Sequence, residues 1–175
     1  YDLVENLLFI TRIENGTMQL NLQPEMIEDI FREAIHHLGR NKRKHNISMH
    51  LEDDLLMANM DARLIIQVLV NLINNAIKYT PENSNISLNA RRVEDKILIE
   101  VQDDGNGVLH PDQLFEMFYT ENNRGGDTRR GMGLGLSLCK SIIQSHGGTI
   151  WVENVTPHGA CFKFVLDAVE VKLYE

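Results

Sequence analysis

Hydrophobic residues recur along the chain at two spacings, and each spacing predicts a different kind of element. Apolar positions three or four residues apart predict helices over residues 3–13, 26–38, 62–79 and 134–146. Apolar positions that alternate with polar ones predict strands over residues 18–22, 47–51, 55–59, 86–93, 96–103, 149–154 and 161–166. Because strands and helices are mixed and hairpins dominate, we expect an α+β fold. It is a two-layer α/β sandwich with a mostly antiparallel mixed sheet and helices on one face.

The segments between these elements add detail to this prediction. The helix over residues 62–79 follows Asp61, a favourable N-cap residue, and ends before Thr80 and Pro81. Residues 111–118 have the pattern of a short helix. Residues 120–130 are polar, contain glycines and lack a period, which predicts a mobile loop.

Composition and charge exclude several classes of protein. Of 175 residues, 43% are hydrophobic and 24% are charged, the balance of one globular domain with a sizeable core. The net charge of −8 argues against binding to nucleic acid or anionic lipid by bulk charge. No apolar stretch approaches the roughly 18 residues of a membrane span. The two cysteines lack a repeated spacing, which predicts reduced thiols, and the start at Tyr1 in mid-pattern suggests a fragment.

Three polar residues share one side of the long predicted helix. At 100° per residue, Asn71, Asn75 and Lys78 fall within an arc of roughly 60°. Leu64 and Val68 lie on the same arc one and two turns earlier, so the polar side chains emerge where the buried face opens. This is the geometry of a pocket edge, although two semi-exposed asparagines would give the same pattern.

A carboxylate and two glycines follow the strand predicted over residues 96–103. Alternation places Asp103 on the same inward face as the apolar residues before it, where a carboxylate needs hydrogen-bond donors. Gly105 and Gly107 then allow a tight turn and the close approach of a flat ligand. The alternative is an ordinary turn that ends a strand.

A second glycine-rich segment directly precedes the last predicted helix. In the run from Gly131 through Gly133 to Gly135, backbone N–H groups lie open at the positive end of a helix, where they can hold phosphates. A polar segment precedes the run in place of the strand of a dinucleotide-binding turn, and no Gly-Lys-Ser/Thr of a P-loop follows it.

Taken in order, these segments resemble a known family. Residues 71–80, 103–107, 115–119 and 131–135 are similar to the N, G1, F and G2 boxes of the ATP-binding domain of bacterial sensor histidine kinases. This domain belongs to the larger group that includes gyrase, Hsp90 and MutL. The resemblance spans nearly the whole chain, and residues 159–162 are similar to the potassium-responsive subgroup.

The resemblance implies a role for each matching position. Asp103 would accept from the adenine amino group, and Tyr79 would lie near the adenine. Asn75 would bind Mg²⁺ through its amide oxygen, while Asn71 and Lys78 would hold phosphates, so these three are the implied catalytic residues. The implied nucleotide-binding set is Asn71, Asn75, Lys78, Tyr79, Asp103, Gly105, Gly107, the lid cations Arg124, Arg129 and Arg130, and Gly131, Gly133, Leu134, Gly135 and Leu136.

The resemblance also implies a reaction and partners. Residues 1–15 would be the tail of a dimerisation and phosphoacceptor helix, and residues 16–175 the ATP-binding catalytic domain of a protein-histidine kinase. The cofactors would be ATP and Mg²⁺, and the γ-phosphoryl group would pass to a histidine on the separate dimerisation domain of a homodimer. We expect a response regulator as partner, a cytoplasmic location within a membrane-anchored protein, and neither nucleic acid nor direct membrane contact for this fragment.

Two alternatives and two departures stay open at this point. The alternatives are a hydrolysing ATPase like gyrase, Hsp90 or MutL, and a non-catalytic regulatory module that binds nucleotide. Asn74 stands where many members of the family carry an acid, and Thr120 stands where an arginine often follows the F box. None of the seven histidines lies in the acidic, proline-containing context of the family's acceptor, so we expect the acceptor upstream of Tyr1.

Overall fold

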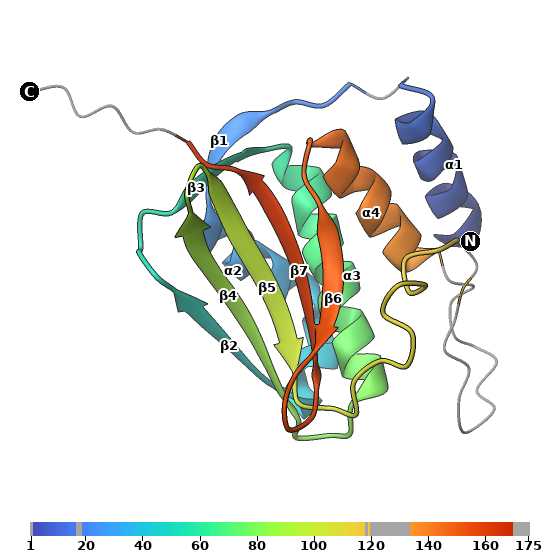
Figure 1. The fold of residues 1–175 in the computed structure, drawn as a ribbon, viewed down its shortest axis with the longest axis vertical. Coiled ribbons are helices and arrows are strands. Elements are labelled where there is room, and N and C mark those ends of the chain that lie inside the picture. Colours follow the sequence, from blue (N-terminus) through green and yellow to red (C-terminus); the bar gives the residue numbers. More distant parts are fainter. Residues whose placement is uncertain (1, 17–18, 118, 120–133, 170–175) are drawn as a thin grey trace, which may run out of the picture.

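A computed structural model describes residues 2–16, 19–117, 119 and 134–169 (Figure 1). The helices are α1 (Asp2–Glu14), α2 (Ile27–His37), α3 (Ala62–Tyr79) and α4 (Gly135–Ser145), with a 3₁₀ segment η1 (Gly39–Lys44). The strands are β1 (Gln23–Met26), β2 (Asn46–Leu51), β3 (Met57–Met60), β4 (Asn85–Val93), β5 (Lys96–Asp103), β6 (Ile150–Asn154) and β7 (Ala160–Asp167). Among the described residues, no helix is both long and apolar enough to span a bilayer.

Five strands form one mixed sheet in the order β2-β4-β5-β7-β6. Only β2 and β4 pair in parallel within this sheet, and the hairpins β4–β5 and β6–β7 are antiparallel. β1 and β3 form a separate antiparallel pair. This architecture confirms the predicted α+β class with a mostly antiparallel mixed sheet.

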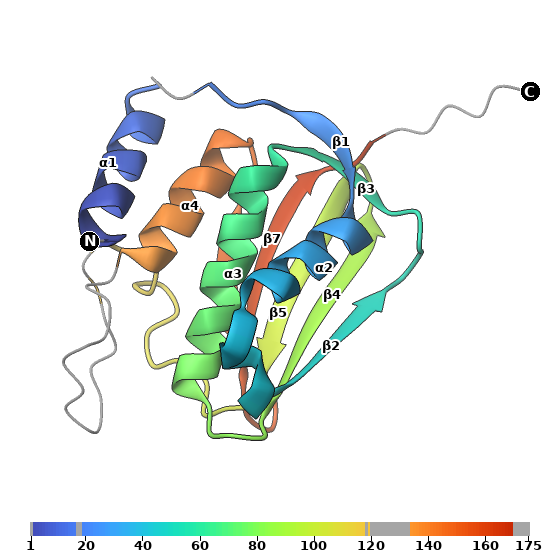
Figure 2. The ribbon, with the colours of Figure 1, turned by 180° about the vertical axis from the view of Figure 1, so that it is seen from behind.

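The helices form a layer on one face of the sheet (Figure 2). From one side of that layer to the other they follow the order α2, α3, α4 and α1, so α1 packs on α4. Inward residues of the sheet such as Ile99 and Phe164 are fully buried against α3 residues such as Leu69. Full burial of each such side chain stabilises the fold by about 1.5–3 kcal/mol.

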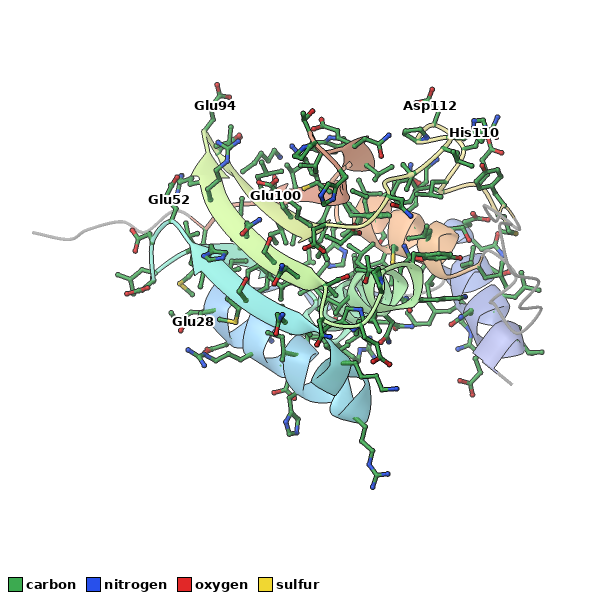
Figure 3. The ribbon with its side chains drawn as sticks, turned by 90° about the horizontal axis from the view of Figure 1, so that it is seen from below. Glu28, Glu52, Glu94, Glu100, His110 and Asp112 are labelled. Carbon is green, nitrogen blue, oxygen red and sulfur yellow. The ribbon has the colours of Figure 1, made fainter. Side chains whose placement is uncertain are left out.

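In the part of the chain that the structure describes, no helix covers the opposite face of the sheet (Figures 1 and 2). Figure 3 shows the two layers from below, with Glu28 on α2 in one layer and Glu100 in the sheet of the other. On this outer face the Lys163 Nζ lies 2.9 Å from a Glu153 carboxylate oxygen and 3.8 Å from one of Glu100. The Cys161 thiol donates to Glu100 at 3.2 Å, and burial together with this carboxylate raises its pKa to about 12.

The sequence misplaced the shortest elements. The strand predicted over 18–22 is found at β1, which contains Pro24, and the strand predicted over 55–59 is found at β3. These two strands pair with each other, and Ala58 of β3 also forms a bridge with Ala168, so their bounds depend on contacts distant in sequence. Residues 111–117 form turns and not the predicted helix, and residues 118 and 120–130 lie outside the described part of the chain.

Asp61 occupies the N-cap position of α3, as predicted, but its side chain makes no capping hydrogen bond. One carboxylate oxygen accepts instead from the Asn21 backbone N–H at 3.2 Å and lies 3.4 Å from Arg63 Nη2. The Asp61 backbone N–H donates to Nε2 of His146 at 3.0 Å. The prediction of the position was therefore correct, and the prediction of a side-chain cap was wrong.

His146 joins the C-terminal end of α4 to the start of α3. Its side chain is buried, and its Nδ1 lies 2.8 Å from the Ile142 carbonyl. Because Nε2 accepts from Asp61, Nδ1 carries the proton and the ring is neutral. Burial lowers the pKa of His146, and the hydrogen bond to Ile142 and the Asp61 carboxylate oppose this in that order.

We expect the folded chain to lose stability as the pH falls below about 6.5, the ordinary pKa of an unfolded histidine. The reason is that the folded pKa of His146 lies below the unfolded one, so its contribution is complete above that pH and declines on acidification. Urea unfolding between pH 7.5 and 5 measures the effect. His146→Gln keeps an acceptor without a titratable ring, and an equally steep loss in that variant would contradict the assignment.

Candidate nucleotide-binding site

Three connections distant in sequence meet at one end of the sheet. They are the α3–β4 connection, the turn after β5 and the β6–β7 turn, which gather at the lower end of Figure 1. The contacts are close, because a Cβ added at Gly105 would lie 2.8 Å from the Thr80 γ-methyl group. One added at Gly159 would lie 2.2 Å from the Asp103 carbonyl oxygen.

Asp103 ends β5 with its carboxylate held by two backbone amides. Its Oδ1 accepts from the N–H of Gly105 at 2.9 Å and from that of Ala160 at 3.2 Å. Burial raises the pKa of Asp103, the two amides oppose this, and the adjacent Asp104 carboxylate adds to the rise. Both bonds end on Oδ1, so Oδ2 has no donor among the described residues and can accept from a ligand amino group.

The polar residues of α3 differ in burial. Asn71 and Asn75 are half-buried, and Lys78 is exposed. The Asn71 Nδ2 is buried and has no hydrogen-bond partner in the part of the chain that the structure describes. Asn71 lies beside the Cys139 thiol of α4, whose pKa burial raises to about 12 while this amide acts in the opposite direction. A buried amide donor of this kind needs an acceptor oxygen, and a phosphate supplies one.

Lys78 and Tyr79 have exposed side chains at the C-terminal end of α3. Tyr79 is 40% exposed, and the Lys78 ammonium lies 5.5 Å from the centre of its ring. The Tyr79 carbonyl oxygen would lie 3.6 Å from a Cβ added at Gly105. The backbone of Tyr79, which carries this exposed ring, therefore lies next to the turn that follows Asp103.

The N-terminal end of α4 faces the same half of α3. The two helices pack antiparallel, and the Cys139 Sγ lies 3.8 Å from the Val68 carbonyl. Gly135 begins α4 after Leu134, and no side chain among the described residues caps this end. The N–H groups of such a helix start can bind an anion. Leu134 itself is buried, while Leu136 is half-buried.

The structure describes only part of the predicted set. Arg124, Arg129, Arg130, Gly131, Gly133 and Thr120 lie outside the described part of the chain. The F box is placed in part, because Phe115 packs edge-to-face on Phe162 of β7 with ring centres 6.0 Å apart. Figure 3 shows His110 and Asp112 on the preceding loop, pointing outward from it.

Sequence reasoning missed the residues that hold this turn in place. Thr80 donates to the Ala76 carbonyl at 2.7 Å, and its Oγ1 lies 2.9 Å from His45 Nε2. The Ala160 amide bonds Asp103, and Asn154 bonds the Val108 backbone. No spacing rule could have found these contacts, because most of them involve backbone groups and join segments far apart in the chain.

The residues present fit a magnesium nucleotide. The amide oxygen of Asn75 is a ligand type that Mg²⁺ accepts. The buried Asn71 amide, the Lys78 ammonium and the open end of α4 are donors suited to phosphate oxygens. The free Asp103 oxygen suits the amino group of a base.

Comparison with known proteins gives the same assignment. A family model described as "Histidine kinase-, DNA gyrase B-, and HSP90-like ATPase" matches residues 60–170. The sensor protein KdpD of Clostridium acetobutylicum is 35% identical over 164 residues, which cover 93% of this chain and 18% of that protein. The adaptive-response sensory kinase SasA of a Synechocystis species is 35% identical over 170 residues, which cover 94% of this chain and 44% of that protein. The chain thus spans less than half the length of these relatives.

Solved structures show the same fold. The catalytic domain of histidine kinase ThkA matches with a TM-score of 0.74 and 28% identity, covering 84% of this chain and 95% of that one. ThkA in complex with the response regulator protein TrrA matches with a TM-score of 0.75 and 26% identity, covering 96% and 48% of the two chains. The matches to KdpD support the subgroup that residues 159–162 indicated. The chain therefore belongs to the histidine kinase-, DNA gyrase B- and HSP90-like ATPase family, as an ATP-binding histidine kinase catalytic domain.

Proposed function

We propose that the chain binds Mg²⁺-ATP and donates the γ-phosphoryl group to a histidine on a separate helical domain. One observation carries this proposal: the turn that holds the Asp103 carboxylate packs on the end of α3, and α4 packs on the side of α3 that carries Asn71. This is the arrangement needed to hold a base at one side and a phosphate chain at the other.

The chain's own residues would act mainly by positioning. The Asp103 carboxylate fixes the base, while Asn71 and Lys78 donate to phosphate oxygens and orient the chain toward the acceptor. The amide oxygen of Asn75 would hold Mg²⁺, which neutralises phosphate charge when it is bound. We propose that the phosphate contacts are completed by Arg124, Arg129, Arg130, Gly131 and Gly133.

Activated hydrolysis of ATP, as in gyrase or Hsp90, is the less favoured function. Those enzymes use a glutamate one helical turn before the Mg²⁺-binding asparagine to activate water. In this chain that position is Asn71, and a neutral amide cannot act as a general base. A purely regulatory nucleotide-binding module would share the binding residues but would transfer nothing.

One experiment separates the three functions. The chain is incubated with Mg²⁺ and γ-labelled ATP, with and without an added dimerisation domain that carries its histidine. We expect label on the added domain, little free phosphate and no label on the chain alone. Rapid phosphate release would favour hydrolysis, and binding without either product would favour a regulatory module. Stable label on His36 or His37 would contradict the proposed external acceptor.

We propose that α1 continues into the dimerisation domain, which would cover its exposed apolar face. Ile10 of α1 is buried against the rest of the chain, whereas Val4 is 61% exposed and Leu8 is 51% exposed. An apolar face left uncovered in this way fits a helix that continues a helical dimerisation domain. We propose residues 1–15 as the end of that helix, with residues 16–175 as the catalytic domain. The same proposal includes a homodimeric parent protein and a response regulator as its partner. It also includes a cytoplasmic location below a membrane anchor.

The base specificity of the site provides a direct test. We expect the chain to bind ATP more tightly than GTP, because a carboxylate suits an amino group at position six of the purine and repels a carbonyl oxygen there. Asp103→Ala should weaken ATP binding by about 1–3 kcal/mol, as for a lost hydrogen bond to a charged group, and should leave GTP binding nearly unchanged. Titration calorimetry measures both nucleotides. Equal affinities in the unchanged chain would refute the role of Asp103.

A further inference from the structure

The β6–β7 turn is bonded to the turn that follows Asp103 at several points. At one side the His158 ring Nδ1 lies 2.8 Å from the Asp104 carbonyl oxygen. At the other, Asn154 of β6 reaches Val108. Between the two, the Ala160 N–H donates to Asp103 Oδ1. These contacts join residues 103–108 to residues 154–160 over both ends of the turn.

Asn154 makes the most specific of these contacts. Its Oδ1 accepts from the Val108 N–H at 2.7 Å, and its Nδ2 donates to the Val108 carbonyl at 3.0 Å. The side-chain amide therefore bonds both backbone groups of one residue, as a neighbouring strand would. Asparagine has both the donor and the acceptor that this pairing requires.

The pairing constrains the backbone between Asp103 and Val108. Gly107 has a φ of +81°, and a Cβ added there would lie 2.6 Å from the Asn154 Oδ1. The turn therefore packs so closely on the Asn154 side chain that no larger residue fits at Gly107. The Gly105 N–H, which holds the Asp103 Oδ1, belongs to the same short turn. Loss of the Asn154 bonds would release the far end of the turn that orients the carboxylate.

We propose that Asn154, assisted by His158, is a positioning residue for adenine recognition. It acts through Val108 and the turn, so that the Asp103 Oδ2 points to the amino group of the base. The inference rests on the proposed function, because it needs Asp103 to be the base acceptor. A residue in this role changes the preference for the amino group, whereas a residue that only supports the fold changes all nucleotide affinities together.

The test compares ATP with purine riboside triphosphate, which lacks the six-amino group and is otherwise the same. Calorimetry with Mg²⁺ gives both dissociation constants for the unchanged chain, Asn154→Ala, His158→Ala and Asn89→Ala. Asn89 is the matched control, since it lies on the outer face of β4 opposite Glu100. The exchange rate of the Val108 amide is followed by NMR as an independent readout of the lost bond.

We expect Asn154→Ala to weaken ATP binding about fivefold to tenfold and the analogue less than about twofold, as for one lost hydrogen bond. Val108 amide exchange should accelerate in the same variant, and Asn89→Ala should change neither affinity. His158→Ala removes one contact from an exposed side chain, so it should shift the preference in the same direction by less. If Asn154→Ala does not fold, the change in preference for ATP over the analogue in His158→Ala still tests the inference.

The outcomes separate this inference from the proposed function. An unchanged chain that does not prefer ATP over the analogue would overturn the Asp103 assignment and the inference with it. A clear preference that survives in the Asn154 and His158 variants would overturn the inference alone. Equal weakening of both nucleotides would also overturn it, because that result indicates only a loss of fold stability.

Discussion

Replacing Asn75 by alanine is expected to reduce phosphoryl transfer to an added acceptor domain by about 100-fold or more, the scale seen when one group that stabilises transition-state charge is removed. Asn75 is half-buried on α3, one turn beyond Asn71, and its amide oxygen is the proposed Mg²⁺ ligand. Alanine is a strong helix former, so the helix itself should persist. Transfer of label from ATP measures the effect.

Two controls keep this result interpretable. Asn89→Ala changes the same residue type on the outer face of the sheet and should transfer at the normal rate. Affinity for Mg²⁺, measured through the Mg²⁺ dependence of ATP binding, should fall in Asn75→Ala alone. Normal transfer by Asn75→Ala would remove Asn75 from the proposed metal site.

The second large effect is expected from Gly159→Ala. Gly159 has a φ of +123°, and an added Cβ would lie 2.2 Å from the Asp103 carbonyl oxygen, a backbone atom that cannot move aside. We expect the free energy of unfolding to fall by about 3 kcal/mol or more, since backbone strain and a core-like clash combine. Denaturant unfolding gives the stability, and calorimetry on the folded fraction gives the ATP affinity, which should fall as well.

Gly39 provides the matched control for this change. It also has a positive φ, +61°, but apart from its chain neighbours no described residue has an atom within 4 Å of an added Cβ. Gly39→Ala should therefore cost only about 1 kcal/mol, the strain of the conformation itself. Equal losses in the two variants would show that the contact with Asp103 does not matter.

The sequence predicted those parts of the fold that depend on long local patterns. The bounds of α3 agree with the predicted residues 62–79, because eighteen residues carry one continuous apolar face. The β4–β5 hairpin was also found, since alternation runs through both strands. β1 and β3 have four residues each and depend on each other, so the local pattern placed both too early.

The same distinction holds at the candidate site. Asn71, Asn75 and Asp103 stand in patterns that fix the side from which they emerge. The structure has Asp103 at the end of β5 beside Gly105 and Ala160, and Asn71 on α3 beside Cys139 of α4. Asn154 and Ala160 were missed because a backbone group is one partner in each contact, and backbone groups leave no trace in residue type. The contacts between residues 103–108 and residues 154–160 are a property of the tertiary fold alone.

The two cysteines have a practical consequence. Cys139 lies between α3 and α4, Cys161 lies in β7, and both thiols are buried with pKa values raised to about 12. Only a thiolate reacts readily with an alkylating reagent, so in the folded chain both sulfurs are protected by burial and by protonation. The alkylation rate therefore reports how often each layer opens. Cys139 thus serves as a built-in chemical probe of the helix packing beside Asn71, and Cys161 as a probe of the sheet beside Glu100.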